Sequence, residues 1–402
     1  MDKYDIVIVG GGLVGASLAA CLQHLPLKIA IIEAKPQAVP AENDNRIIAL
    51  NYVSRRIFEG MGIWQHIEPH AEPIKHIHVS NRGHFGIARL PHQLLNLPAL
   101  GYVVRAKHIG QGLHPFLSST DFIAPAEVTQ ITPQDDTVRI TFQQGSQTRT
   151  VSTQLLIAAD GANSSICQQL DIPIQVQHYE QTAIITNITL EQSHQNIAYE
   201  RFTDTGPIAL LPIADKQYSL VWTVKHEDVD AMLVLDDSGF LDKIQQQFGW
   251  RAGRFIATEK RFAFPLSLSY AAHLTTQRTV IMGNAAHTVH PVAGQGFNLG
   301  LRDVASLAEA MDTAWEHGQK DVGSDGILQT YVSYQADDQK AVTWLTDGLV
   351  KLFSNNLIPL AAVRNIGLLT LDAFPPAKKY LMQQMTGLNS YPSGLARGRG
   401  IK

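Results

Sequence analysis

The chain has 402 residues, of which 45% are hydrophobic and 17% are charged. The chain is longer than one domain with a single hydrophobic core usually is, and its composition excludes an intrinsically disordered protein. We therefore expect two globular domains. A net charge of −4 argues against nucleic acid as a partner. The only cysteines, Cys21 and Cys167, are too few for a disulfide framework and favour a reducing compartment.

The N-terminal segment MDKYDIVIVGGG carries acids and does not resemble a cleavable signal sequence. Apolar runs stay well below the roughly 18 residues that a membrane-spanning helix needs. We therefore expect a cytoplasmic protein that is either soluble or peripheral to the inner membrane.

The first elements predict a βαβ unit. The apolar run YDIVIVG (residues 4–10) is typical of a strand buried on both faces of a parallel sheet. The small-residue segment LVGASLAACLQHL predicts a helix from Leu13, and KIAIIEA (residues 28–34) predicts the second buried strand. Strand, glycine turn, helix and strand in this order define the unit.

The middle of the chain has a different pattern. Two short strands flank the turn NRGH between residues 74 and 91, and residues 173–264 alternate between apolar and polar side chains. This alternation predicts an antiparallel sheet in a layer separate from the βαβ unit. The segment RTVIMGNAAH predicts a return to a buried strand, and a helical pattern follows from about residue 300.

The turn GGGLVG supplies Gly10, Gly12 and Gly15 in the spacing GxGxxG, and Glu33 ends the next strand. Gly10 permits the tight turn, Gly12 permits close approach of a pyrophosphate, and Gly15 permits helix packing on the sheet. The helix N-terminus favours the diphosphate, and Glu33 can accept a hydrogen bond from a ribose hydroxyl. The motif predicts dinucleotide binding without separating FAD from NAD.

Two further strand ends carry motifs. LLIAADGANSSIC ends a buried strand at Asp160 and Gly161, and RTVIMGNAAHTVHPVAGQGFNLGLRD ends another at Gly283 and Asn284. With the GxGxxG turn, these marks resemble those of the class A flavoprotein aromatic hydroxylases, the family of para-hydroxybenzoate hydroxylase, along essentially the whole chain. DNRIIALN, HIHVSNRGHFG, YERFTDTGPIALLPI and VRNIGLLTLDAFPPAK are similar to the ubiquinone-biosynthesis branch, in particular to its 2-polyprenyl-6-methoxyphenol hydroxylases. Most of the family has Asp where this chain has Asn284, and that branch tends to have Asn.

The resemblance implies an α/β fold, α+β overall, with a Rossmann-like FAD-binding domain, an inserted antiparallel substrate domain and C-terminal helices. It assigns residues 1–75, 98–172 and 278–340 to the FAD-binding domain. Residues 76–97 and 173–277 form the substrate domain, and residues 341–402 form a C-terminal helical region with a basic tail.

The resemblance also implies how FAD binds. Glu33 holds the adenosine ribose, Arg46 lies near the diphosphate and ribityl chain, and Arg105 is a further polar residue in contact with FAD. Val128 lines the adenine, Asn284 contacts the ribityl chain, and residues 291–298 wrap the isoalloxazine. The predicted cofactor-binding residues are Gly10, Gly12, Leu13, Gly15, Glu33, Arg46, Arg105, Val128, Asp160, Gly161, Gly283, Asn284, Pro291, Gly294, Gly296 and Asn298.

The implied activity is an FAD-dependent monooxygenase reaction that hydroxylates a 2-polyprenyl-6-methoxyphenol para to its phenol oxygen. NAD(P)H reduces the flavin, O2 adds to give a C4a-hydroperoxide, and the distal oxygen is transferred to the ring. No second GxGxxG follows a buried strand, so NAD(P)H is expected to bind transiently. The partners are therefore a prenylated phenol and O2.

No side chain has a firm claim to catalysis. Arg82 and His84 are candidates for reaching the phenol oxygen, with solvated turn residues as the alternative, and His287 is a candidate for proton handling or for a structural place in its loop. His287 and His290 lie three residues apart, but a third ligand at metal spacing is missing, so we expect no metal site.

Three alternatives stay open. The strand at residues 205–213 is either an apolar cover for the prenylated ring or ordinary core. The segment 376–402 has five basic residues and no acid, and is either a solvated tail or a contact for anionic lipid or for a ubiquinone-biosynthesis complex. The whole chain is alternatively a different ring hydroxylase of the pathway, a prenyl reductase of the same fold, or a non-catalytic flavoprotein scaffold.

Overall fold

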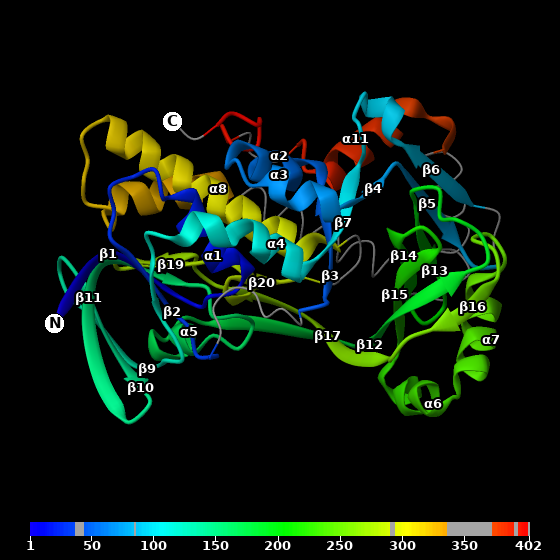
Figure 1. The fold of residues 1–402 in the computed structure, drawn as a ribbon, viewed down its shortest axis with the longest axis horizontal. Coiled ribbons are helices and arrows are strands. Elements are labelled where there is room, and N and C mark those ends of the chain that lie inside the picture. Colours follow the sequence, from blue (N-terminus) through cyan, green and yellow to red (C-terminus); the bar gives the residue numbers. More distant parts are fainter. Residues whose placement is uncertain (37–43, 84–85, 290–293, 336–371, 390–392, 401–402) are drawn as a thin grey trace.

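The computed structural model describes residues 1–36, 44–83, 86–289, 294–335, 372–389 and 393–400. Two main parts lie side by side, one built on a largely parallel sheet and the other on a largely antiparallel sheet (Figure 1). Strands β12 and β17 run from one part into the other along the lower side of that view.

The first sheet contains the predicted βαβ unit. Strand β1 pairs in parallel with β2 on one side and with β11 on the other. Within the described residues this sheet has eight strands, in the order β18-β19-β11-β1-β2-β8 with β10 and β9 continuing from β11. The bounds are β1 Asp2–Val9, β2 Ile29–Ile32, β8 Asp121–Ile123, β9 Glu127–Pro133, β10 Val138–Gln144, β11 Gln147–Ala158, β18 Thr275–Thr276 and β19 Thr279–Ile281.

Apolar side chains cover both faces of this sheet. Ile6 and Ile8 point into a core shared with helices, whereas Val7 and Val9 point into a core shared with β9, β10 and α5. A strand that is buried on both faces has a continuous apolar sequence. This pattern is the reason why β1 could be predicted. The covering helices are α1 Leu13–Cys21, α2 Tyr52–Gly60, α3 Trp64–Ile67, α4 Ala106–Leu113, α5 Ser165–Gln169 and α8 Gln295–Glu316.

The second sheet is the predicted antiparallel layer, and Trp222 is buried in its core. Among the described residues it has nine strands, in the order β20-β17-β12-β15-β14-β13-β5-β6, with β16 paired to β12. One pair, β13 with β5, is parallel. The bounds are β5 His76–Asn81, β6 Ile87–Pro91, β12 Ile174–Leu190, β13 Ile197–Phe202, β14 Pro207–Ala214, β15 Gln217–Lys225, β16 Phe255–Thr258, β17 Phe262–Ala271 and β20 His287–Thr288.

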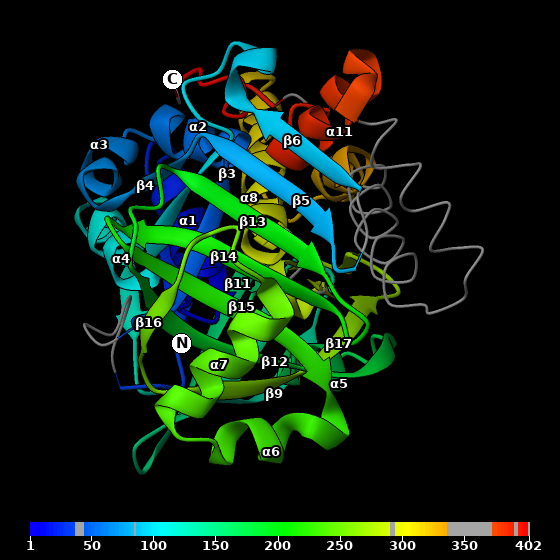
Figure 2. The same ribbon diagram turned by 90° about the vertical axis from the view of Figure 1, so that its right-hand side faces the viewer.

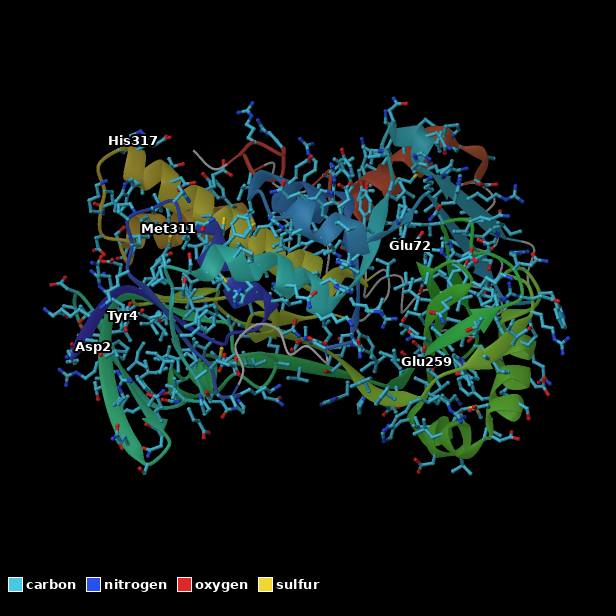
Figure 3. The ribbon with its side chains drawn as sticks, in the orientation of Figure 1. Asp2, Tyr4, Glu72, Glu259, Met311 and His317 are labelled. Carbon is cyan, nitrogen blue, oxygen red and sulfur yellow. The ribbon has the colours of Figure 1, made fainter. Side chains whose placement is uncertain are left out.

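Helices α6 (Val229–Val234) and α7 (Asp237–Phe248) cover the outer face of this sheet (Figures 1 and 2). The inner face meets a small antiparallel sheet in the order β3-β7-β4, with bounds Ile47–Asn51, Gly101–Arg105 and Glu72–Ile74. The Asn196 amide donates a 2.6 Å hydrogen bond to Glu72 across this junction, where Figure 3 labels Glu72. The second sheet is therefore sandwiched between helices and the cofactor-type part.

Helix α11 (Pro375–Thr386) and residues 393–400 pack back onto the molecule. Leu395 and Ala396 are buried in the core beside α2, so this part of the basic segment is not a solvated tail. Lys378 is also buried, and its Nζ lies 2.7 Å from Oδ1 of Asp372. Across the described residues, helices long and apolar enough to cross a membrane are absent.

Candidate cofactor and substrate site

The glycine turn has the geometry that its sequence predicts. Gly10 has a φ of +110°, and a Cβ there would lie 2.3 Å from the carbonyl oxygen of Ala159. A Cβ at Gly15 would lie 2.1 Å from the carbonyl oxygen of Gly10. In contrast, a Cβ at Gly12 would meet nothing within 4 Å. The fold thus requires glycine at positions 10 and 15, whereas Gly12 borders open space.

That open space lies at the N-terminus of α1. Gly12 is the residue that precedes the helix, followed by Leu13, and it has no side chain to cap the first amides. Free N–H groups and the helix dipole at such an end attract an anion. The residues present therefore fit the diphosphate of a dinucleotide such as the expected FAD.

Glu33 lies directly beside this turn. Its Oε2 accepts a hydrogen bond of 2.7 Å from the Gly11 N–H, and its Oε1 accepts one of 2.9 Å from the Lys35 N–H. A carboxylate has about four acceptor positions, so capacity for ribose hydroxyls is left. The Ala126 N–H donates to the Glu33 carbonyl, so the segment before Val128 lies beside Glu33, and the contact of Val128 with adenine stays a prediction.

The second strand end provides an unpaired acceptor. Asp160 follows β11, and its Oδ2 accepts weak hydrogen bonds of 3.3 Å from Ser165 and Ile166. Its Oδ1 is buried and has no hydrogen-bond partner among the described residues. Gly161 has a φ of +94° and open space where a Cβ would stand. A buried acceptor without a partner is the group that a cofactor hydroxyl would satisfy.

Arg46 and Arg105 come together across the small sheet. Ile47 pairs with Arg105, and the Ala106 N–H donates to the Arg46 carbonyl, so the two arginines are neighbours. The guanidinium of Arg46 is exposed and forms two hydrogen bonds with Asp44, of 2.8 and 2.7 Å. Burial raises the pKa of Asp44, but these bonds outweigh burial and hold the pKa below its usual value. Contact of Arg46 with FAD stays a prediction.

The third strand end is held by a buried pair. The Gly283 N–H donates to Oδ2 of Asp303 over 3.0 Å, and Nε2 of His287 lies 2.8 Å from the same oxygen. His287 and Asp303 are 3% and 0% exposed. His287 therefore fixes the turn from inside the protein, whereas Asn284 is exposed at its surface. Asp303 was not predicted, because nothing in its helix pattern indicates a partner sixteen residues earlier.

The start of α8 is locked to the small sheet. Gly294 has a φ of +59°, and a Cβ there would lie 2.9 Å from the Cβ of Ala49. The Asn298 amide donates to the carbonyls of Ala49 and Gly294 and accepts from the Asn51 N–H, all within 2.8 Å. Its side chain thus ties the start of α8 to β3, whereas a Cβ at Gly296 would meet only Cγ2 of Val289, at 3.9 Å.

The remaining candidates are less central. Arg82 follows β5 and lies 3.6 Å from Asp204, with both side chains exposed. His84, Pro291 and His290 lie outside the described residues. The described residues contain no group of three or more His, Cys, Asp or Glu placed to hold a metal ion.

Comparison with known proteins gives the family. A family model described as an FAD binding domain matches residues 3–344. The chain is 33% identical to the ubiquinone hydroxylase UbiL of Rhodospirillum rubrum, over 98% of this chain and 92% of the relative. It is 31% identical to the human mitochondrial ubiquinone biosynthesis monooxygenase COQ6, over 94% of this chain and 92% of the relative.

Among solved structures, the p-nitrophenol 4-monooxygenase PnpA of Pseudomonas putida is similar to this chain with a TM-score of 0.79. The match covers 97% of this chain and 99% of PnpA at 16% identity, which confirms the predicted fold. The chain therefore belongs to the ubiquinone-biosynthesis branch of the class A FAD-dependent aromatic hydroxylases, and it is a flavoprotein monooxygenase.

Proposed function

We propose that this enzyme hydroxylates a 2-polyprenyl-6-methoxyphenol para to its phenol oxygen, in ubiquinone biosynthesis, with NAD(P)H as a transient co-substrate. FAD supplies, when bound, the redox chemistry that passes one atom of O2 to the ring. The protein's own part is to bind and orient both molecules and to exclude water.

The observation that carries the substrate class is the inner face of the second sheet. Ile185, Val221 and Ala209 form one row across neighbouring strands, and Phe262 extends it. Phe262 and Phe264 are 48% and 51% exposed, which is unusual for large apolar side chains on a sheet face. A prenyl chain laid on such a face gains about 0.8 kcal/mol for each buried methylene.

The geometry also connects this face to the cofactor turn. On β17, Ser269 and Tyr270 pair with Thr288 and His287, just after the turn at Gly283. Phe264 lies five residues before Ser269 on the same strand, about 17 Å away at the usual rise. The face therefore runs continuously from the strand beside the cofactor turn to the exposed Phe264, and a prenylated phenol can lie along it.

Each of the described groups around the glycine turn and the other two strand ends has its own part in binding FAD. The amides at the start of α1 bind the diphosphate, Glu33 and Asp160 accept from hydroxyl groups, and the buried pair under Gly283 keeps the third strand end in place. A prenylated substrate resides in a bilayer, so the proposal includes contact of the enzyme with the inner-membrane surface.

Cells that lack this protein should accumulate 2-polyprenyl-6-methoxyphenol. Cells that contain it should, when grown with heavy oxygen gas, carry one labelled oxygen at the para position. Accumulation of a different ring precursor would assign the enzyme to another hydroxylation of the pathway. Label taken from water, or normal quinone in the mutant, would contradict the proposal.

A further inference from the structure

Glu200 occupies an unusual place in the second sheet. It lies in β13, and its backbone pairs with Val79 of β5 and with Ala209 of β14. Both flanking strands are themselves paired further out, so Glu200 is on an interior strand. A carboxyl at such a position has apolar neighbours on the strands at either side.

The side chain of Glu200 points to the inner face. Its neighbour Tyr199 packs edge-on against Phe248 of α7, with ring centroids 5.6 Å apart, so Tyr199 is on the outer face. Side chains alternate along a strand, which places Glu200 and Ala198 on the opposite face. Ala198 packs with Ile74 and Val103 of the small sheet, on the cofactor side of the sheet (Figure 1).

One oxygen of this partly buried carboxyl has no hydrogen-bond partner among the described residues. Oε1 of Glu200 is buried, and no described residue donates a hydrogen bond to it. Burial alone raises the pKa of Glu200 to about 8, and no charged side chain contributes. An unpaired polar group inside a protein is costly, and an apolar residue would be cheaper here. Stability therefore gives no reason for this glutamate.

A second unpaired group lies on the same face. Asn81 pairs with Phe202, two positions along the strands from the Val79–Glu200 pair. Its Nδ2 is also buried and has no acceptor within the described part of the chain. Two buried polar atoms without partners, Oε1 of Glu200 and Nδ2 of Asn81, therefore occupy neighbouring positions on this face, beside the apolar Val79 and Ala209.

We propose that Glu200 and Asn81 form the hydrogen-bonding site for the ring oxygen of the phenolic substrate. A carboxylic acid offers one donor and one acceptor, and the amide offers a further donor. A phenol hydroxyl needs both kinds of partner, and these groups supply them without bringing a fixed charge into the apolar layer. The inference rests on the proposed function, because it takes the substrate to be a phenol.

The test is equilibrium binding to the FAD-loaded enzyme. The two probes are 2-methoxy-6-geranylphenol and its O-methyl ether, which lacks the phenol O–H. The wild type should bind the phenol about tenfold more tightly than the ether, as expected for one buried hydrogen bond. Glu200→Leu should remove this preference, whereas Glu200→Gln, which keeps a donor and an acceptor, should retain most of it.

Controls separate a binding role from a structural one. Glu259→Gln removes an exposed carboxylate, labelled in Figure 3, that accepts a hydrogen bond from Asn187, and it should bind both probes as the wild type does. All variants should keep full FAD content. A wild type without the preference, or a Glu200→Leu variant that retains it, would overturn the inference.

Product analysis on the same samples tests the proposed function separately. Hydroxylation at another ring position, with the preference lost in Glu200→Leu, would refute the proposed function and leave the Glu200 site standing. Hydroxylation para to the phenol oxygen, with the preference unchanged in that variant, would refute only the Glu200 site.

Discussion

Nε2 of His287 lies 2.8 Å from Oδ2 of Asp303, and both side chains are buried beneath the turn at Gly283. The same carboxylate oxygen thus holds a side chain from β20 and the backbone of the turn that is predicted to contact FAD. This contact joins α8, β20 and the strand end into one rigid unit.

Asp303→Ala should therefore destabilise the protein and weaken FAD binding. The change leaves the buried Gly283 N–H and His287 without their acceptor, which costs about 3–5 kcal/mol of the free energy of unfolding. Urea unfolding and the FAD content of the purified protein measure both effects. Asp312→Ala is the matched control, because Asp312 is on the same helix but its pairing with His24 is partly exposed, so its cost should stay below about 1 kcal/mol. Equal losses in the two variants would contradict this account.

Gly12→Val should fold normally and yet lose FAD. The backbone φ of Gly12 is −67° and nothing lies within 4 Å of its Cβ position, so only the bound diphosphate would meet the new side chain. Gly15→Val should instead fail to fold, because its Cβ would overlap the Gly10 carbonyl oxygen. Thermal unfolding and flavin absorbance distinguish these outcomes. A yellow, fully loaded Gly12→Val protein would refute the placement of the diphosphate.

Asn284→Asp should retain most of the activity and stability. Asn284 is exposed, so an added charge needs little desolvation, and many family members have Asp at this position. The measurement is the pH dependence of kcat in both proteins. A large loss of rate together with a new acidic limb in the variant would show that this residue handles a proton.

Glu200 should make the protein less stable as the pH rises. Its pKa is about 8 in the folded chain, whereas an unperturbed glutamate titrates near about 4.3. Between these values the folded state binds more protons than the unfolded state, so stability falls with rising pH by at most about 1.4 kcal/mol per unit. The groups that face Glu200 from adjacent strands are apolar, namely Val79 and Ala209, and do not titrate in this range.

Glu200→Gln should accordingly gain stability over the wild type between pH 5 and pH 8. Urea unfolding at both pH values gives the difference in the free energy of unfolding. The control Glu259→Gln should follow the wild-type profile. A constant difference between Glu200→Gln and the wild type across this range would show that the carboxyl is ionised in the folded protein.

The sequence by itself determined the elements whose side chains repeat with a clear period. The strand before Gly10, the glycine turn and α1 could be predicted because each has a local pattern, apolar on both faces or rich in small residues. The alternating segment after residue 173 likewise determined an antiparallel layer. The glycine turn indicated a dinucleotide, because a pyrophosphate needs close backbone approach at a helix N-terminus, and the resemblance of the further motifs indicated FAD and the reaction class.

Only the tertiary structure decided which polar side chains meet. The His287–Asp303 contact spans sixteen residues, and Asn298 reaches Asn51 across 247. Alternation shows that a strand has two faces but does not show which face meets the cofactor part, so Glu200 could not be identified from its strand alone. The sequence also could not show that Lys378 is paired with Asp372, and its charge is therefore not free to face a membrane. Such pairings depend on distances between elements far apart in the chain, and local sequence patterns do not encode those distances.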